Sequence, residues 1–75
     1  MKSKLNKISI KVGINIKVLR IKRNLTQEEL AEYANVSRAA ISDIERGKSS
    51  PSVDTVGLIA EALKVDLYKL FIFED

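Results

Sequence analysis

The side chains best suited to chemical recognition lie in one short stretch, residues 37–48, where polar and apolar residues recur at helical spacing. On a helical wheel at about 100° per residue, Ile41 and Ile44 fall on one side. The other side carries only small or hydrogen-bonding side chains, which are Arg38, Ala39, Ser42, Asp43 and Arg46. Because none of these is large and apolar, that face can enter a groove about 12 Å wide. Taken alone, an amphipathic helix with a solvated face is the simpler explanation.

The composition argues against catalysis and metal binding. The 75-residue chain contains no histidine and no cysteine, so common general bases, thiol nucleophiles and soft metal ligands are missing. It also has no glycine-rich loop of the phosphate-binding kind and no carboxylate pair in an evident pocket. We therefore expect no enzymatic activity, no cofactor, no metal and no small-molecule ligand.

Local signals predict the helices that position the candidate face. Thr26 and Glu29 form a capping box, in which each side chain accepts a hydrogen bond from the other residue's backbone N–H. A helix should therefore begin at Gln27. Asn35 tolerates the left-handed conformation that ends a helix.

A second helix follows after a short turn. Ser37 is expected to cap a helix from Arg38 to Arg46, which Gly47 terminates. Two helices joined by a turn of three residues form a helix-turn-helix, here over residues 27–46.

Two flanking segments can cover the inner face of this pair. Residues 9–23 fit a helix with Gly13 as a local weakness, although residues 8–18 also alternate as a strand would. The length of the segment and the lack of a hairpin partner favour the helix. Downstream, Ser52 caps a helix whose apolar residues repeat at helical spacing, at Val53, Val56, Ile59, Ala60 and Leu63.

A short fifth helix is expected after Asp66, its predicted cap, through Leu67, Leu70 and Phe71. The predicted fold is therefore all-α, a compact five-helix domain over residues 9–75. Residues 1–8 are polar and basic, and we expect them to form a flexible arm.

Charge is distributed unevenly along the chain. Residues 1–27 contain eight Lys or Arg and no acidic residue, whereas residues 28–75 contain five basic and ten acidic residues. A cationic first third suits a polyanionic partner, although a solvated basic tail has the same composition. No apolar run approaches the ~18 residues of a membrane span, and no secretory signal is evident. We therefore expect a cytoplasmic protein.

Together these features resemble a known family. Residues 16–71 are similar to the Cro/phage-repressor type of helix-turn-helix domain, which includes the xenobiotic-response-element regulators of bacteria. The resemblance rests on LTQEELA, VS..IS.IERGK, the following Pro-Ser pair and IAEAL at consistent spacings. It implies a lambda repressor-like fold of five helices, whose third helix recognises double-stranded DNA to regulate transcription. Restriction-modification controller proteins, single-domain phage repressors and antitoxin-type regulators are all similar, and the sequence does not choose among them.

The resemblance places four residues at base-reading positions. Arg38 stands where a guanidinium can bind guanine O6 and N7, with a phosphate contact as the alternative. Ala39 offers only a methyl group, and Ser42 suits either a base or a phosphate. Asp43 is unusual on a surface for DNA: it can accept from cytosine N4, orient Arg46, or exclude wrong bases by repulsion.

Positions that contact the DNA backbone are implied in the same way. These residues would position the protein rather than read the sequence, and they are Thr26, Gln27, Ser37, Arg46, Lys48, Ser49 and Ser50. Arg20 and Glu45 match family positions that form a partly buried ion pair, so we expect both to be structural.

The C-terminal segment is too apolar to be an ordinary outer element. Leu67, Leu70 and Phe71 can pack on the neighbouring helices, which leaves other large side chains without a place in so small a core. We therefore predict a homodimer whose interface contains Leu67, Tyr68, Phe71, Ile72 and Phe73. Two alternatives stay open. A patch of Ile14, Val18 and Ile21 can form or join the interface, or the tail can close over its own core.

The predicted function is therefore sequence-specific binding of an inverted-repeat operator by a homodimer. Repression is the default outcome, and activation is equally compatible. The main alternative is a protein-interaction module of the same fold without specific DNA binding. A salt titration separates the two, because only binding driven by counterion release weakens steeply with salt.

Overall fold

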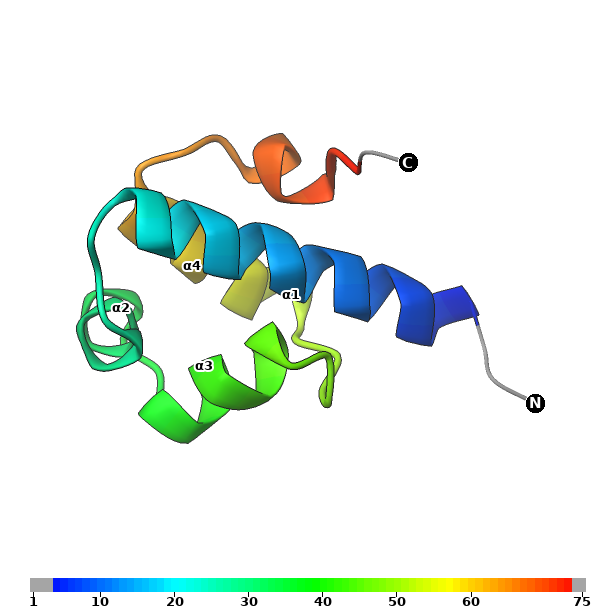
Figure 1. The fold of residues 1–75 in the computed structure, drawn as a ribbon, viewed down its shortest axis with the longest axis horizontal. Helices are drawn as coiled ribbons and strands as arrows, with labels where there is room; N and C mark the ends of the chain where they lie inside the picture. The colour runs from blue at the N-terminus through cyan, green and yellow to red at the C-terminus, as the bar shows by residue number, and fades with distance from the viewer. Residues whose placement is uncertain (1–3, 74–75) are drawn as a thin grey trace.

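One long helix crosses the middle of the molecule. The computed structural model describes residues 4–73, with side chains from residue 8 onward. In that range it contains four α-helices and one 3-10 helix, which are α1 (Lys4–Lys22), α2 (Gln27–Ala34), α3 (Arg38–Glu45), α4 (Val53–Leu63) and η1 (Leu67–Phe71). In Figure 1, α2 and α3 lie on one side of α1, and η1 lies on the other. The all-α class is therefore confirmed, and the alternating residues 8–18 belong to a helix.

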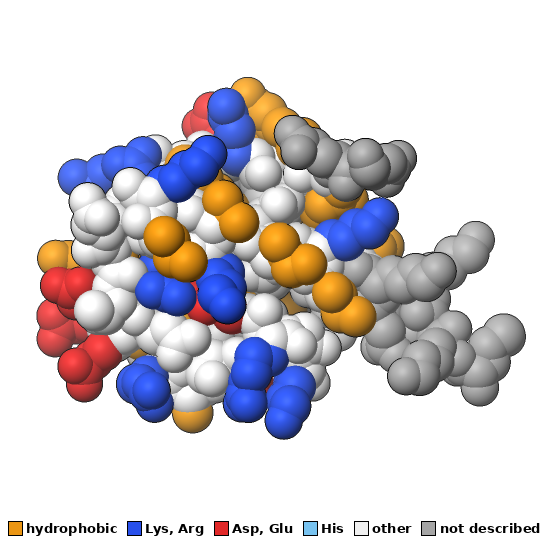
Figure 2. Space-filling model, viewed as in Figure 1, with side chains coloured by type: hydrophobic (Ala, Val, Ile, Leu, Met, Phe, Trp, Pro, Cys, Tyr) orange, Lys and Arg blue, Asp and Glu red, His pale blue; other side chains and the backbone are white. Residues whose placement is uncertain are grey.

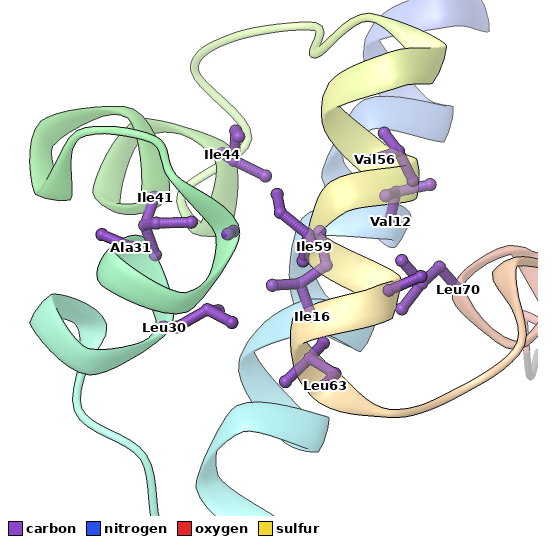
Figure 3. Close-up of a cluster of buried hydrophobic side chains, with 12 residues drawn as sticks. Val12, Ile16, Leu30, Ala31, Ile41, Ile44, Val56, Ile59, Leu63 and Leu70 are labelled. Atoms are coloured by element: carbon purple, nitrogen blue, oxygen red, sulfur yellow. The ribbon is translucent and has the colours of Figure 1, made fainter.

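The hydrophobic core lies where all five elements meet. Figure 3 shows buried side chains from every element pointing toward one another. The largest that are fully buried are Ile16, Leu30, Ile41, Ile59, Leu63 and Leu70. In the described part of the chain, no helix combines the length and the apolar character needed to cross a membrane.

The predicted helix starts are confirmed by their hydrogen bonds. The Thr26 hydroxyl accepts from the Glu29 backbone N–H at 3.0 Å, and the Glu29 carboxylate accepts from the Thr26 N–H at 2.9 Å. Ser37 and Ser52 cap α3 and α4 through hydroxyls that accept from the backbone N–H three residues later. Asn35 ends α2 with φ at 59°, in the left-handed region. These short-range contacts fix the turn between α2 and α3.

α1 differs from the expected helix in its start and in the role of its glycine. It begins at Lys4 rather than at residue 9, within the stretch expected to be an arm; residues 1–3 of that stretch lie outside the described range. Gly13 is a point of close contact rather than a weakness, because a Cβ there would collide with the backbone carbonyl of Ile44. The missing side chain lets the backbones of α1 and α3 approach closely.

The fifth element corrects the prediction of a fifth α-helix. η1 is a 3-10 helix of five residues, and Asp66 makes no side-chain capping bond to it. Asn15 Nδ2 donates to the carbonyl oxygens of Leu70 and Ile72, at 3.0 and 2.9 Å. The backbone is extended at Ile72 (φ −88°, ψ 115°). So short a segment gains little from α-helix formation, and α1 provides partners for its carbonyls instead.

Candidate nucleic-acid interface

α3 presents two faces of opposite character. Ile41 and Ile44 are buried in the core, and Glu45 is buried beside them. The four predicted reading residues lie on the remaining surface, the first two exposed and the last two half-buried: Arg38, Ala39, Ser42 and Asp43. This arrangement allows the outer face of α3 to contact a ligand without uncovering the core.

Asp43 and Arg46 form an ion pair at the end of this face. Arg46 Nη2 lies 3.1 Å from Asp43 Oδ1, and Arg46 Nε lies 3.4 Å from the carbonyl oxygen of Ser42. About half of each side chain stays exposed, 57% for Arg46 and 47% for Asp43, so the pair adds at most about 1 kcal/mol to stability. Three roles were open for Asp43, and this ion pair favours the one in which Asp43 orients the side chain of Arg46.

The residues predicted to contact DNA phosphates lie in two parts of the structure, at the starts of α2 and α3 and in the loop after α3. Thr26 and Ser37 lie before α2 and α3, where their oxygens accept the capping hydrogen bonds. A capping hydroxyl accepts through a lone pair of its oxygen, so its own proton is still available for a hydrogen bond to a phosphate. In the loop after α3, Lys48 and Ser50 are exposed and Ser49 is half-buried.

Arg20 and Glu45 form the centre of a buried polar network. Arg20 donates to the Glu45 carboxylate twice, from Nε at 2.6 Å and from Nη2 at 3.1 Å. Its Nη1 donates to the carbonyl oxygen of Leu25 at 2.7 Å. Only 12% of the Arg20 side chain and 2% of the Glu45 side chain are exposed. The network therefore ties α1, the loop before α2, and α3 together.

Gln27 joins the same network, a contact that the sequence analysis missed. Its Nε2 donates to Glu45 Oε1 at 3.0 Å, and the side chain is half-buried. Its backbone N–H, at the first position of α2, belongs to the donors that intrahelical bonding does not use. A phosphate contact at Gln27 stays a prediction. Both this N–H and the second hydrogen of the side-chain amide can donate, because Glu45 takes only one of the two amide donors.

Two other residues that matter to the site were also missed. Gly13 sets the approach of α1 to α3, and Asn15 binds the C-terminal segment. Asn15 stands between Ile14 and Ile16, and a lone amide in an otherwise apolar run was a signal that it has a specific partner.

Figure 2 shows how charged and hydrophobic side chains are distributed over one face of the molecule. Lys and Arg side chains lie along the lower edge, where α3 lies in Figure 1, and also in the middle and upper parts of this face. Acidic side chains gather mainly at the left, over α2. Hydrophobic side chains form a band across the middle, along α1. The edge that carries α3 therefore presents positive charge to an approaching ligand.

Comparison with known proteins agrees with this arrangement. The helix-turn-helix family model matches residues 16–70. The immunity repressor of Bacillus phage phi105 is 46% identical over 56 residues, which cover 75% of this chain and 39% of the repressor. An uncharacterized transcriptional regulator of Methanocaldococcus jannaschii is 43% identical over 60 residues, covering 80% of this chain and 91% of the regulator.

Solved structures give the same result for the fold. The restriction-modification controller protein C.AhdI from Aeromonas hydrophila superposes with a TM-score of 0.82 at 30% sequence identity, covering 84% of this chain and 96% of the controller. The chain therefore belongs to the helix-turn-helix family and is, by class, a DNA-binding transcriptional regulator. The resemblance to the Cro/phage-repressor type is confirmed.

Proposed function

We propose that this protein controls transcription by binding an inverted-repeat operator as a homodimer, with α3 of each copy in the major groove. The observation that carries the proposal is the division of α3 into a buried apolar face and an outer face without large apolar side chains. Two-fold symmetry would place two such helices in successive grooves, with half-site centres roughly 34–36 Å apart. At a promoter the dimer would block polymerase, or contact it from an adjacent site.

Base reading is assigned to the outer face of α3. Arg38, exposed at the start of the helix, donates two parallel hydrogen bonds to guanine. Ala39 contacts a thymine methyl group, and Ser42 bonds to a base or to a phosphate. Asp43 acts through Arg46, whose guanidinium it holds.

Contacts with the DNA backbone are assigned to two segments beside the outer face of α3. The start of α2 and the segment after α3 bind phosphates through Thr26, Gln27, Ser37, Arg46, Lys48, Ser49 and Ser50. This activity needs no enzyme chemistry, cofactor, small molecule or membrane, and it belongs in the cytoplasm.

Self-association is assigned to the tail, which we define as residues 66–73. Its apolar side chains are 40–59% exposed at Leu67, Tyr68, Phe71 and Ile72, while Phe73 is half-buried against the core. Exposed clusters of this kind usually mark an interface. The competing patch on α1 borders the tail, since Ile14 and Val18 line one groove with Ile72.

Selection of bound fragments from random duplex DNA tests the proposal. We expect enrichment of an inverted repeat, and sedimentation at tens of micromolar should show a dimer that binds one such site. Enrichment of no sequence, or binding that is insensitive to salt, would favour a protein-interaction module instead.

A further inference from the structure

The tail is held to α1 by one side chain with two donors. Asn15 Nδ2 bonds to the carbonyl oxygens of both Leu70 and Ile72. Leu70 is the one residue of η1 that is buried. Phe73, at the end of the tail, also packs against the core and is partly buried. Two apolar contacts hold a short segment in place but do not fix its backbone carbonyls. The Asn15 amide adds that constraint, because it binds the carbonyls of Leu70 and Ile72, one on each side of Phe71.

A second contact continues this arrangement along α1. The Lys11 ammonium lies 5.5 Å from the centre of the Phe73 ring, one turn of α1 before Asn15. Such contacts at partly exposed sites are weak. Asn15 therefore provides the hydrogen bonds that orient the tail, in addition to the packing of Leu70 and Phe73 against the core.

The opposite side of the same helical turn is fixed to α3. Residues two positions apart are rotated by about 200° around the helix axis, so Gly13 and Asn15 face nearly opposite sides and contact different neighbours. Gly13 lies against the Ile44 carbonyl of α3, and Asn15 holds the tail. α1 is thus a rigid spacer, and these two residues set how far the tail lies from α3 and at what angle.

We propose that Asn15 is a positioning residue for operator recognition, because it fixes the tail and thereby the separation of the two α3 helices in the dimer. The inference rests on the proposed homodimer. If the tail forms the two-fold interface, a tail that can rotate lets the second α3 fall at several distances from the first. The protein would then still read one half-site but lose its preference for a particular half-site spacing.

Operators that differ only in half-site spacing test this role. Asn15→Asp has nearly the same shape but presents a carboxylate to two carbonyl oxygens and cannot donate to them. Asn15→Ala removes the donors without adding charge and suits a helix. Asn24→Asp is the matched control, since it adds the same charge at an exposed site and leaves the Asn15 hydrogen bonds in place.

The expected result is a change in spacing preference alone. Wild type and Asn24→Asp should bind operators of one half-site spacing about a hundredfold more tightly than operators whose spacing is one base pair longer or shorter. This factor is at the lower end of the affinity gained when both half-sites are bound at once. In both Asn15 variants this ratio of affinities should fall below about tenfold, because the dimer would no longer hold its two α3 helices at one separation. Their affinities for an isolated half-site should stay within about twofold of wild type, because α3 is unchanged.

The outcomes separate this inference from the function on which it rests. If wild type itself shows no spacing preference and sediments as a monomer, the homodimer is wrong and the role of Asn15 falls with it. If wild type is selective and folded Asn15→Ala is equally selective, only the inference about Asn15 is wrong.

Discussion

The side of α1 that faces α3 and the side that faces the tail are held by different kinds of contact. Toward α3, a glycine allows backbone contact and a desolvated Arg20–Glu45 pair joins the ends of both helices. Toward the tail, the buried Leu70, the partly buried Phe73 and the Asn15 amide hold a short segment whose other large side chains are 40–59% exposed. The first side fixes the unit that carries α3, and the second leaves apolar surface for another molecule.

The largest effect on stability should come from the buried pair. Glu45→Ala leaves the Arg20 guanidinium desolvated without its carboxylate, at a cost of about 3–5 kcal/mol. Since a domain of this size has roughly 5–10 kcal/mol of stability at most, thermal unfolding should occur at a much lower temperature.

Asp43→Ala is the control, because it removes a carboxylate from the exposed pair with Arg46. It should change the free energy of unfolding by less than about 1 kcal/mol. Equal melting temperatures for wild type and Glu45→Ala would mean that the pair is solvated in solution.

The next largest effect should come from Gly13. Gly13→Ala places a methyl group on the backbone carbonyl of Ile44, which a rigid helix cannot move aside. Overpacking of this kind costs about 1–3 kcal/mol, even though alanine is the better helix former. Chemical denaturation would measure the loss.

Gly57 in α4 offers the matched control. A Cβ at that position meets nothing within 4 Å, so Gly57→Ala should raise stability by about 0.4–1 kcal/mol. The two substitutions are chemically identical, so a gain of stability in Gly13→Ala as well as in Gly57→Ala would contradict the close contact between α1 and α3.

Truncation on the outer face of α3 should affect binding rather than folding. Arg38→Ala should cost about 1–3 kcal/mol on the preferred operator and relax selection at one base pair. Lys48→Ala should instead weaken binding to all duplexes alike and lower the salt slope by about one. An Arg38→Ala protein that loses affinity equally on every sequence would make Arg38 a phosphate contact.

The sequence was sufficient for the elements whose causes are local. Each of these elements depends on contacts within three or four residues, and each was found where expected. They are the capping box that begins at Thr26, the caps at Ser37 and Ser52, and the left-handed residue Asn35. The inward positions of Ile41 and Ile44 followed from periodicity alone.

The errors concern residues whose partners are far along the chain. Gly13 resembled a weak point because its contact, Ile44, is distant in sequence. The tail resembled an α-helix because its carbonyl partner, Asn15, lies 55 residues before Leu70. The hydrogen bond from Gln27 to Glu45 was not foreseen because Glu45 comes from another helix, while the phosphate contact of Gln27 stays a prediction. The roles of the DNA-contacting residues remain predictions, since they depend on a molecule outside the chain.

The smallest effect on folding should come from the tail surface. Tyr68 and Ile72 are 59% and 51% exposed, so the double substitution Tyr68→Glu, Ile72→Glu should change the free energy of unfolding of the monomer by less than about 0.5 kcal/mol per site. The same change should abolish dimerisation, because two carboxylates from each copy would be buried in a two-fold interface without partners. Val53→Glu is the comparison, as it alters an even more exposed apolar residue, 74% accessible, on α4. Sedimentation should show a monomer for the tail variant and a dimer for Val53→Glu. If the tail variant dimerises as wild type does, self-association uses another surface, and the exposed Ile14, Val18 and Ile21 of α1 become the next residues to substitute.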